Sequence, residues 1–170
     1  MNDDAPEPFA IAEIELAGGG RLGLARLPGR TGQLAADVEA IALWGANLVV
    51  SMTEAAEMTR HGAGELPQAL AQHGIPHHHF AVPDFGAPAE SDARWKPLSE
   101  VLRLNLRKGG SVLLHCMGGK GRSGMVAMRV LAEHGTPPET ALEIVRKARP
   151  GAVETDAQAA WAACGSKGRA

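Results

Sequence analysis

SVLLHCMGGKGRSG, residues 111–124, gives the clearest structural signal in this chain of 170 residues. Its first six residues are nearly all apolar and have the length of a β-strand. Such a strand is expected at the centre of a parallel sheet that is covered on both faces. Helical patterns precede and follow this run, so the sequence predicts an α/β fold with a central, mostly parallel sheet flanked by helices.

Further strands and helices are expected on both sides of this run. Short apolar or alternating segments predict strands at residues 9–16, 21–27, 48–52 and 75–82. Helical spacing and stop signals predict helices at residues 33–44, 53–60, 65–73, 91–108 and 123–134. No repeat, linker or change of composition divides the sequence. We therefore expect one domain over residues 1–170, with its catalytic core at about residues 21–164.

Three threonines are expected to begin helices. Thr53 is a candidate N-cap, and Thr136 and Thr155 each open a capping box, with Glu139 and Gln158 as the partners three residues later. After the last helix the sequence predicts a loose tail at residues 165–170.

Composition excludes some classes of function and favours others. The formal net charge is -2 and no block of Lys and Arg occurs, which argues against nucleic acid as a partner. The N-terminus is acidic and rich in proline, and no apolar run is long enough to span a membrane. These features predict a cytoplasmic protein. Of the two cysteines, Cys164 is expected to pack beside Trp161 rather than to act as a redox partner of Cys116.

The glycine-rich segment predicts an anion site. It lies where a buried strand ends and a helix begins, so its backbone N–H groups can converge in front of the helix N-terminus. Gly118, Gly119, Gly121 and Gly124 permit the dihedral angles of a tight loop and keep side chains away from a ligand. A phosphate is the expected occupant.

Two side chains of this segment point to phosphate chemistry. Arg122 offers a planar fork that matches two oxygens of a tetrahedral phosphate. Cys116 would lie near the helix dipole, the loop amides and Arg122, all of which favour the thiolate. The sequence therefore predicts Cys116 as a nucleophile and Arg122 as a clamp on the phosphate.

Breaking a phosphate ester also requires an acid that protonates the leaving oxygen. Asp84 is the candidate, because it lies on a loop between Pro83 and Pro88 that follows a strand. An ordinary turn at a strand end is the alternative for this aspartate. Asp92 is the reserve candidate, although its position fits the start of a helix.

HCMGGKGRSG, residues 115–124, with VPDFGAP, residues 82–88, upstream, strongly resembles the cysteine-dependent protein tyrosine and dual-specificity phosphatases. LARLPGR, HHHFAVPDFGAP and RPGAVETDAQ are similar to segments of the kinase-associated, cyclin-dependent kinase inhibitor-like subgroup. The resemblance covers roughly residues 22–162. It implies the phosphatase fold and hydrolysis of phosphate monoesters through a cysteinyl-phosphate intermediate, with no metal or organic cofactor.

The resemblance also implies roles for individual residues. Asp84 matches the general acid, Ser123 the hydroxyl that eases departure of the thiolate, and His115 the residue that fixes the loop. Gln158 matches a residue that orients the hydrolytic water. Capping of a helix is the alternative for Ser123 and for Gln158. The phosphate-binding set implied by the motif is Met117, Gly118, Gly119, Lys120, Gly121 and Arg122.

Substrate preference remains open between several classes. The expected partner is a phosphorylated protein, with a cleft that accepts phosphotyrosine and phosphoserine or phosphothreonine. Lys120 favours a second class, phosphoinositides or other polyanionic phosphate esters, since related lipid phosphatases have a basic residue there. Met117 argues against that class, because those enzymes have another lysine at its position. A phosphate-dependent binding module is the third alternative.

His77 and His79 share one face of a predicted strand and invite a metal interpretation. Two histidines make an incomplete ligand set, and we expect no metal site.

Overall fold

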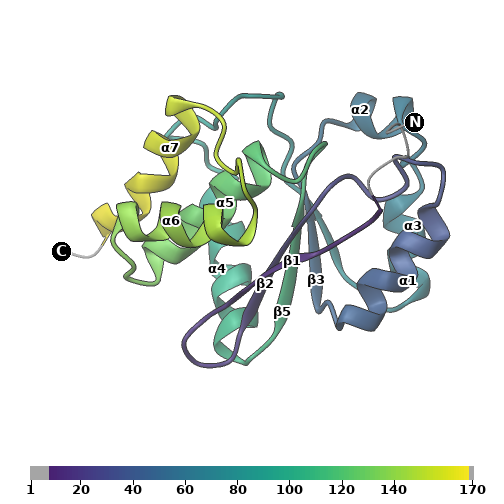
Figure 1. Cartoon of the computed structure of the whole chain (residues 1–170), viewed down its shortest axis with the longest axis horizontal. Helices are drawn as coiled ribbons and strands as arrows, with labels where there is room; N and C mark the ends of the chain where they lie inside the picture. Colours follow the sequence, from purple (N-terminus) through teal and green to yellow (C-terminus); the bar gives the residue numbers. More distant parts are fainter. Residues whose placement is uncertain (1–7, 169–170) are drawn as a thin grey trace, which may run out of the picture.

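Strand β5 (Ser111–His115) lies at the centre of a five-stranded sheet and is buried along its whole length. The computed structural model describes residues 8–168. The sheet has the order β1-β2-β5-β3-β4 (Figure 1). The other strands are β1 (Ala12–Glu15), β2 (Arg21–Ala25), β3 (Leu48–Ser51) and β4 (His77–His79). Only the edge strand β1 is antiparallel to its neighbour, which confirms the predicted mostly parallel sheet.

Helices cover both faces of the sheet, as Figure 1 shows. One face carries α1 (Leu34–Trp44) and α3 (Leu66–Gln72), with α2 (Ala55–Arg60) near its upper end. The other face carries α4 (Trp95–Arg107), α5 (Gly121–Glu133), α6 (Pro138–Ala148) and α7 (Asp156–Ala163).

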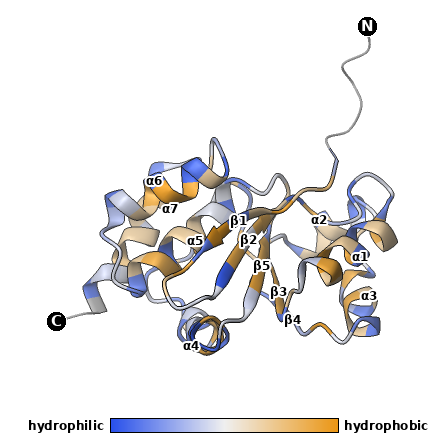
Figure 2. Cartoon of the chain, turned by 60° about the horizontal axis from the view of Figure 1, so that its bottom comes forward, coloured by the Kyte–Doolittle hydropathy of each residue, from blue (hydrophilic) through white to orange (hydrophobic). Residues whose placement is uncertain are grey.

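Successive residues of the central strands pack into two separate hydrophobic cores. Val112 and Leu114 contribute to the core beneath α4 and α5, whereas Leu113 lies in the core with α1 and α3. This alternation follows from the pleat, since neighbouring side chains of a strand point to opposite faces. Both faces are covered, so every position of the strand has to be buried. Figure 2 shows the hydrophobic strands lying between the two groups of helices.

Most predicted elements are present, but several ends differ from prediction. The N-cap of α2 is Glu54 rather than Thr53, and Glu54 and Glu57 form a capping box there. Helix α6 has Pro137 rather than Thr136 at its N-cap position. A proline at the first helical position restrains the residue before it to an extended conformation, so the boundary falls at Pro137. The capping box of Thr155 and Gln158 is confirmed.

Further ends were also predicted wrongly, and α4 begins at Trp95 rather than at residue 91. Helix α5 begins at Gly121, two residues earlier than expected, and this places Ser123 inside the helix. The tail is not loose within the described residues, because Cys164–Gly168 forms a 3-10 helix. Pro97 lies within the first turn of α4 and does not interrupt it. Among residues 8–168, no helix combines the length and the hydropathy needed to cross a membrane.

Candidate active site

The loop between β5 and α5 turns its carbonyl groups outward. The carbonyl of Met117 accepts a hydrogen bond from Leu27 N (3.2 Å), that of Gly118 from Arg149 Nη2 (2.9 Å), and that of Lys120 from Val153 N (3.2 Å). The carbonyl and the N–H of a trans peptide bond point in opposite directions. The N–H groups that follow these three carbonyls therefore point toward the inside of the loop.

Two glycines of this loop lie against neighbouring segments, and one of them is required by the backbone geometry. Gly119 has a φ of 71°, and a Cβ atom there would lie 2.5 Å from the carbonyl carbon of Ala25 at the end of β2. A Cβ atom on Gly121 would lie 2.5 Å from Oε1 of Glu154. The clash at Gly119 is with backbone and its φ is positive, so this position needs glycine. At Gly121 the close atom belongs to a flexible side chain, so a larger residue would require only that Glu154 move. Gly118, by contrast, faces open space.

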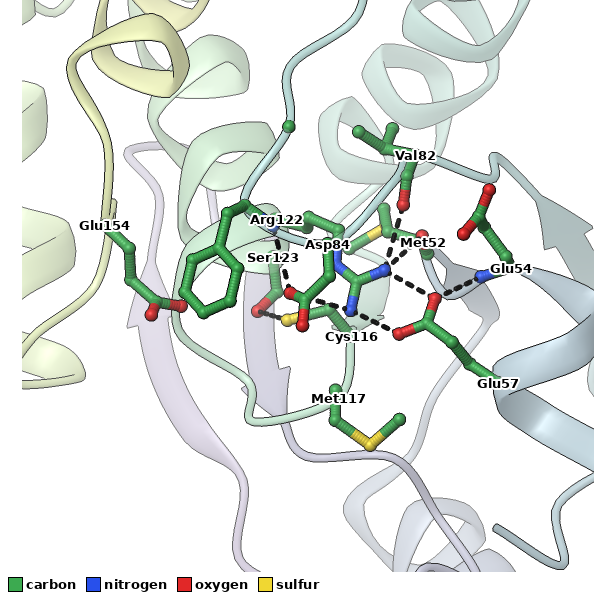
Figure 3. Close-up of polar contacts among 12 residues, drawn as sticks. Met52, Glu54, Glu57, Val82, Asp84, Cys116, Met117, Arg122, Ser123 and Glu154 are labelled. Carbon is green, nitrogen blue, oxygen red and sulfur yellow. Dashed lines mark hydrogen bonds and ion pairs between the residues drawn. The ribbon is translucent and has the colours of Figure 1, made fainter. Parts of the chain in front are cut away.

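Cys116 lies at the start of the loop with its sulfur next to the first turn of α5. Its Sγ is 3.3 Å from Oγ of Ser123, and its exposed fraction is 3%. Figure 3 shows Asp84, Arg122 and Ser123 gathered around this sulfur. Ser123 does not cap α5, because it is buried within the helix and faces the thiol. Cys116 and Cys164 are both free cysteines.

Arg122 is fully buried and its guanidinium joins three segments of the chain. Nη1 and Nη2 donate to the two carboxylate oxygens of Glu57 on α2, at 2.8 and 2.9 Å. Nη1 also donates to the carbonyl of Val82 (2.9 Å), and Nη2 lies 3.2 Å from Oδ1 of Asp84. Its Nε is buried and has no hydrogen-bond partner among residues 8–168. A buried N–H without a partner requires an explanation, and a ligand oxygen supplies one.

The charges of Arg122 and its carboxylate partner stabilise each other. The hydrogen bond from Arg122 holds the pKa of Glu57 below its usual value, against the effect of burial. Burial alone would lower the pKa of Arg122, but the hydrogen bond with Glu57 and the nearby Cys116 and Asp84 raise it. Sequence reasoning missed Glu57 in this role. Its only local signal is the capping box of α2, which says nothing about an arginine 65 residues away.

Asp84 extends from the loop after β4 toward Arg122 and remains half exposed. Its side chain is 51% exposed, and Oδ1 accepts a hydrogen bond from Phe85 N (3.0 Å). The predicted turn contact and the predicted position beside the nucleophile therefore occur together. Phe85 has a φ of 60°, an unusual conformation for a bulky residue. Asp92 instead forms an ion pair with Arg94 and accepts a hydrogen bond from the backbone N–H of Arg94, as expected near the start of α4.

His115 is buried in the sheet and takes part in a hydrogen-bonded series of side chains. Its Nε2 is bonded to Oγ of Ser51, which also lies 2.7 Å from Nε2 of His77. Its Nδ1 lies 3.4 Å from the carbonyl of Cys116. Burial lowers the pKa of His115 to about 3 and that of His77 to about 4. Both histidines are therefore neutral at physiological pH, and they connect the backbone of Cys116 to the sheet.

His77 and His79 do not form a metal centre with other residues. His77 contacts Ser51, and Nε2 of His79 lies 2.6 Å from the carbonyl of Thr53. Within the described part of the chain, no group of three or more histidine, cysteine, aspartate or glutamate residues is arranged to hold a metal ion.

Gln158 is fully buried and ties α7 to the Asp84 loop. Its Oε1 accepts hydrogen bonds from the backbone N–H groups of Glu154 and Thr155, which completes the capping box. Its Nε2 donates to the carbonyl of Gly86 (3.2 Å), two residues after Asp84. The capping role predicted for Gln158 is confirmed, whereas the orienting of the hydrolytic water stays a prediction.

A pocket of about 420 Å³ opens over the loop. It is lined by Asp84, Phe85 and the predicted phosphate-binding residues Met117, Gly118 and Lys120. Its other lining residues are Arg26, Arg30, Thr31, Arg149 and Glu154. Cys116 and Arg122 are not among the residues that line it. The volume is within the roughly 300–1,000 Å³ range of small-molecule sites.

The site thus combines a buried thiol that contacts a serine hydroxyl with a fully buried arginine on the same strand-to-helix loop. This is the arrangement expected of a cysteine-dependent phosphatase. A family profile described as "Swiss Army Knife protein, DSP-PTPase phosphatase domain" (PTP-SAK) matches residues 27–162. The chain belongs to this dual-specificity phosphatase family, which confirms the family expected from the sequence.

Relatives and solved structures agree with this assignment. Cyclin-dependent kinase inhibitor 3 of Mus musculus is 30% identical over 141 residues, with 79% of this chain and 66% of the mouse protein covered. The Rattus norvegicus protein of the same name is 29% identical, with coverages of 90% and 76%. The chain thus spans about two thirds to three quarters of these relatives.

The fold is also similar to solved phosphatase structures. Kinase associated phosphatase (KAP), solved with its catalytic-site cysteine replaced by serine, has a TM-score of 0.84 and 26% identity, with 94% of this chain and 95% of that chain covered. Tk-PTP in its active form has a TM-score of 0.71 and 28% identity, with coverages of 92% and 97%.

Proposed function

We propose that the chain hydrolyses phosphate monoesters through a phosphate bound covalently to Cys116. The Cys116 thiolate attacks phosphorus, the bond from phosphorus to the leaving oxygen breaks, and Asp84 gives that oxygen a proton. Water then attacks the cysteinyl phosphate while the Asp84 carboxylate takes a proton from it. Inorganic phosphate leaves and the thiolate is regenerated, with Ser123 donating a hydrogen bond to the sulfur.

The observation that supports this proposal most is the surroundings of Arg122. Its Nε has no partner within residues 8–168, although it is buried next to the thiol. Together with the inward N–H groups of the loop, this donor would bind the equatorial oxygens of the transferring phosphoryl group. Fixed donors in a buried site stabilise the charge that develops there and usually make the largest contribution to catalysis.

The proposed substrate class is phosphorylated protein, with phosphotyrosine and phosphoserine or phosphothreonine both accepted. Membership of the dual-specificity family supports this class. Phe85 offers an exposed apolar surface at the pocket, beside Asp84, against which a substrate side chain can pack. We further propose that the enzyme acts in the cytoplasm, where a reducing environment keeps a nucleophilic thiol reduced.

The direct test is hydrolysis of p-nitrophenyl phosphate in the presence of a chelator, by the wild type and by Cys116→Ser. We expect metal-independent turnover by the wild type and a loss of at least about 1,000-fold in the variant, because a serine hydroxyl at this position lacks a general base. Turnover that survives the substitution would remove Cys116 from the mechanism. A wild type that binds phosphate without turnover would instead indicate a phosphate-dependent binding module.

A further inference from the structure

Asp84 lies in a tight turn whose backbone is strained. Gly86 N donates to the carbonyl of Pro83 (2.8 Å), which closes the turn over residues 83–86. Phe85, the third residue of this turn, has a φ of 60°, in the left-handed region that suits glycine rather than a bulky side chain. A residue in such a conformation persists only where the surrounding structure holds it there. The turn therefore needs contacts from other parts of the chain.

These contacts come from the N-terminus of α7. Nε2 of Gln158 donates to the carbonyl of Gly86 (3.2 Å), and Oγ1 of Thr155 donates to the carbonyl of Phe85 (3.4 Å). The two carbonyls belong to the residues that follow Asp84 directly in the chain. Gln158 is fully buried, so its hydrogen bond to Gly86 is shielded from water. The Asp84 side chain is half exposed, and its position depends on this turn.

The segment before α7 is itself attached to the phosphate loop. Val153 N donates to the carbonyl of Lys120 (3.2 Å), and Nη2 of Arg146 on α6 donates to the carbonyl of Val153 (3.0 Å). Val153 is buried and, like Phe85, has a φ of 60°. Residues 153–158 thus bridge the loop that bears Cys116 and the turn that bears Asp84.

The amide of Gln158 offers more than a helix cap requires. Glutamate and glutamine both complete a capping box, because the cap needs only a side-chain oxygen that accepts backbone N–H groups. Here Oε1 of Gln158 accepts from the N–H groups of Glu154 and Thr155, at 2.9 and 3.3 Å. Glutamine has an NH₂ group in addition, and this group is the one that reaches the carbonyl of Gly86.

We propose that Gln158 is a positioning residue for the general acid, because it holds the turn in which the Asp84 carboxyl reaches the leaving oxygen. This inference rests on the proposed function and deepens it. Gln158 acts through the backbone of residues 85 and 86 and does not touch the reacting atoms. Proton transfer requires the acid within hydrogen-bond reach of the leaving oxygen, so a displaced turn weakens it. This role differs from orienting the hydrolytic water, which the resemblance implies for Gln158.

The effect of a displaced acid depends on the leaving group. Phenolate needs protonation more than p-nitrophenolate does, so phenyl phosphate reports on the acid and p-nitrophenyl phosphate reports on it far less. The measured quantity is the ratio of kcat/KM for p-nitrophenyl phosphate to kcat/KM for phenyl phosphate. This ratio does not depend on the fraction of active enzyme. It also excludes the later hydrolysis of the cysteinyl phosphate, since kcat/KM covers only the steps up to the formation of that intermediate.

Gln158→Glu removes the proposed contact and keeps the helix cap. The carboxylate still accepts the two backbone N–H groups, but it repels the carbonyl of Gly86. We expect the ratio to rise by about 5- to 20-fold, less than the rise of about 100-fold expected for Asp84→Ala. Ala157→Glu is the matched control, because it adds the same charge at the neighbouring, exposed position of α7, and it should keep the wild-type ratio. A Gln158→Glu ratio equal to that of the wild type would overturn the inference.

A double variant separates positioning of the acid from a purely structural role. If Gln158 acts through Asp84, Gln158→Glu should not raise the ratio further in an Asp84→Ala background. If Gln158 only stabilises the fold, Gln158→Glu should lower the free energy of unfolding in urea, and kcat/KM should fall equally for both substrates. That pattern, or the same rise of the ratio in both backgrounds, would show the positioning role to be wrong.

Failure of this inference is distinguishable from failure of the proposed function. If Asp84→Ala leaves the ratio unchanged, the acid assigned in the proposed function is wrong and the positioning role falls with it. If Cys116-dependent turnover is present and Asp84→Ala raises the ratio, but Gln158→Glu does not, the proposed function stands and only the role of Gln158 is overturned.

Discussion

Arg122 connects the nucleophile loop to two segments that are distant in sequence. Its guanidinium has a bidentate ion pair with Glu57 on α2 and a contact with Asp84 on the loop after β4. A guanidinium held on one side by Glu57 presents its remaining donors in a fixed direction. We therefore expect Glu57 to be a positioning residue, which acts on the phosphate through Arg122.

Replacement of Glu57 by glutamine should impair phosphate binding and catalysis. The amide keeps the size of the side chain, but its NH₂ group faces an arginine N–H where a carboxylate oxygen accepted a hydrogen bond. We expect kcat/KM to fall by about 10- to 100-fold, less than the loss when a stabilising donor is removed outright. Steady-state kinetics with p-nitrophenyl phosphate and the inhibition constant for inorganic phosphate measure the effect.

A purely structural role of Glu57 would produce a different pattern. In that case Glu57→Gln would lower the free energy of unfolding without changing the inhibition constant for phosphate. Glu57→Asp, which keeps the charge on a shorter side chain, is the matched variant and should retain more activity than Glu57→Gln. Equal phosphate affinity in the wild type and both variants would contradict the positioning role.

The residues that sequence reasoning found share a motif, and those it missed do not. Cys116, Arg122 and Ser123 lie within eight residues at the end of a strand, so their spacing alone predicts proximity. Asp84 was predicted from its loop after a strand and from the resemblance to the family's general acid. Glu57 comes from a segment whose place near the site depends on the tertiary fold. The catalytic and binding roles of all these residues remain predictions.

At the scale of elements, the strands were easier to predict than the helix ends. A strand as apolar as β5 is expected to be buried between two layers of helices, and the structure confirms this expectation. Helix ends depend on small differences between competing caps. Glu54, rather than Thr53, is the N-cap of α2. The carboxylates of Glu54 and Glu57 form the reciprocal capping contacts. Sequence spacing alone does not rank two such adjacent candidates.

In helix α7, Gln158 caps the helix and also contacts the loop that bears Asp84. The capping box of Thr155 and Gln158 fixes the start of the helix, and the remaining donor of Gln158 reaches the carbonyl of Gly86. Oγ1 of Thr155 donates to the carbonyl of Phe85. The N-terminus of α7 therefore supports the loop that bears Asp84, a role that no local sequence pattern indicates.

At the scale of the whole molecule, the sheet holds one fully buried and one partly buried histidine, and both are neutral in the folded state. His115 lies on the central strand β5 and His77 on the edge strand β4, with Ser51 of β3 between them. Satisfied hydrogen bonds compensate the burial of these polar rings. A proton on either ring would place a charge inside the sheet.

This arrangement predicts that the protein loses stability as the pH falls below about 6.5. The unfolded chain protonates His115 near its usual pKa of 6.5, whereas burial lowers the folded-state pKa to about 3. Between these values the unfolded state binds more protons, so the free energy of unfolding decreases with falling pH. The expected loss from His115 alone is about 2 kcal/mol between pH 7 and pH 5.

Urea denaturation of the wild type and of His115→Gln at several pH values measures this effect. The variant starts from a lower stability, so the informative quantity is the slope between pH 7 and pH 5, which should be shallower in His115→Gln. The usual pKa of Glu57, 4.5, lies below that window and the hydrogen bond with Arg122 lowers the folded-state pKa further, so Glu57 contributes little to the slope. Identical slopes in both proteins would contradict the neutral, buried state of His115.

The central claim is that phosphate becomes covalently attached to Cys116 during turnover. Rapid quenching of Asp84→Ala during hydrolysis of p-nitrophenyl phosphate tests it most directly, because this leaving group needs little protonation and the variant lacks the base that activates water. Mass spectrometry of the quenched, digested protein should find one phosphate on the peptide that contains Cys116, and none in Cys116→Ser. Phosphate attached to another residue, or a chain that turns over without any covalent phosphate, would contradict the account.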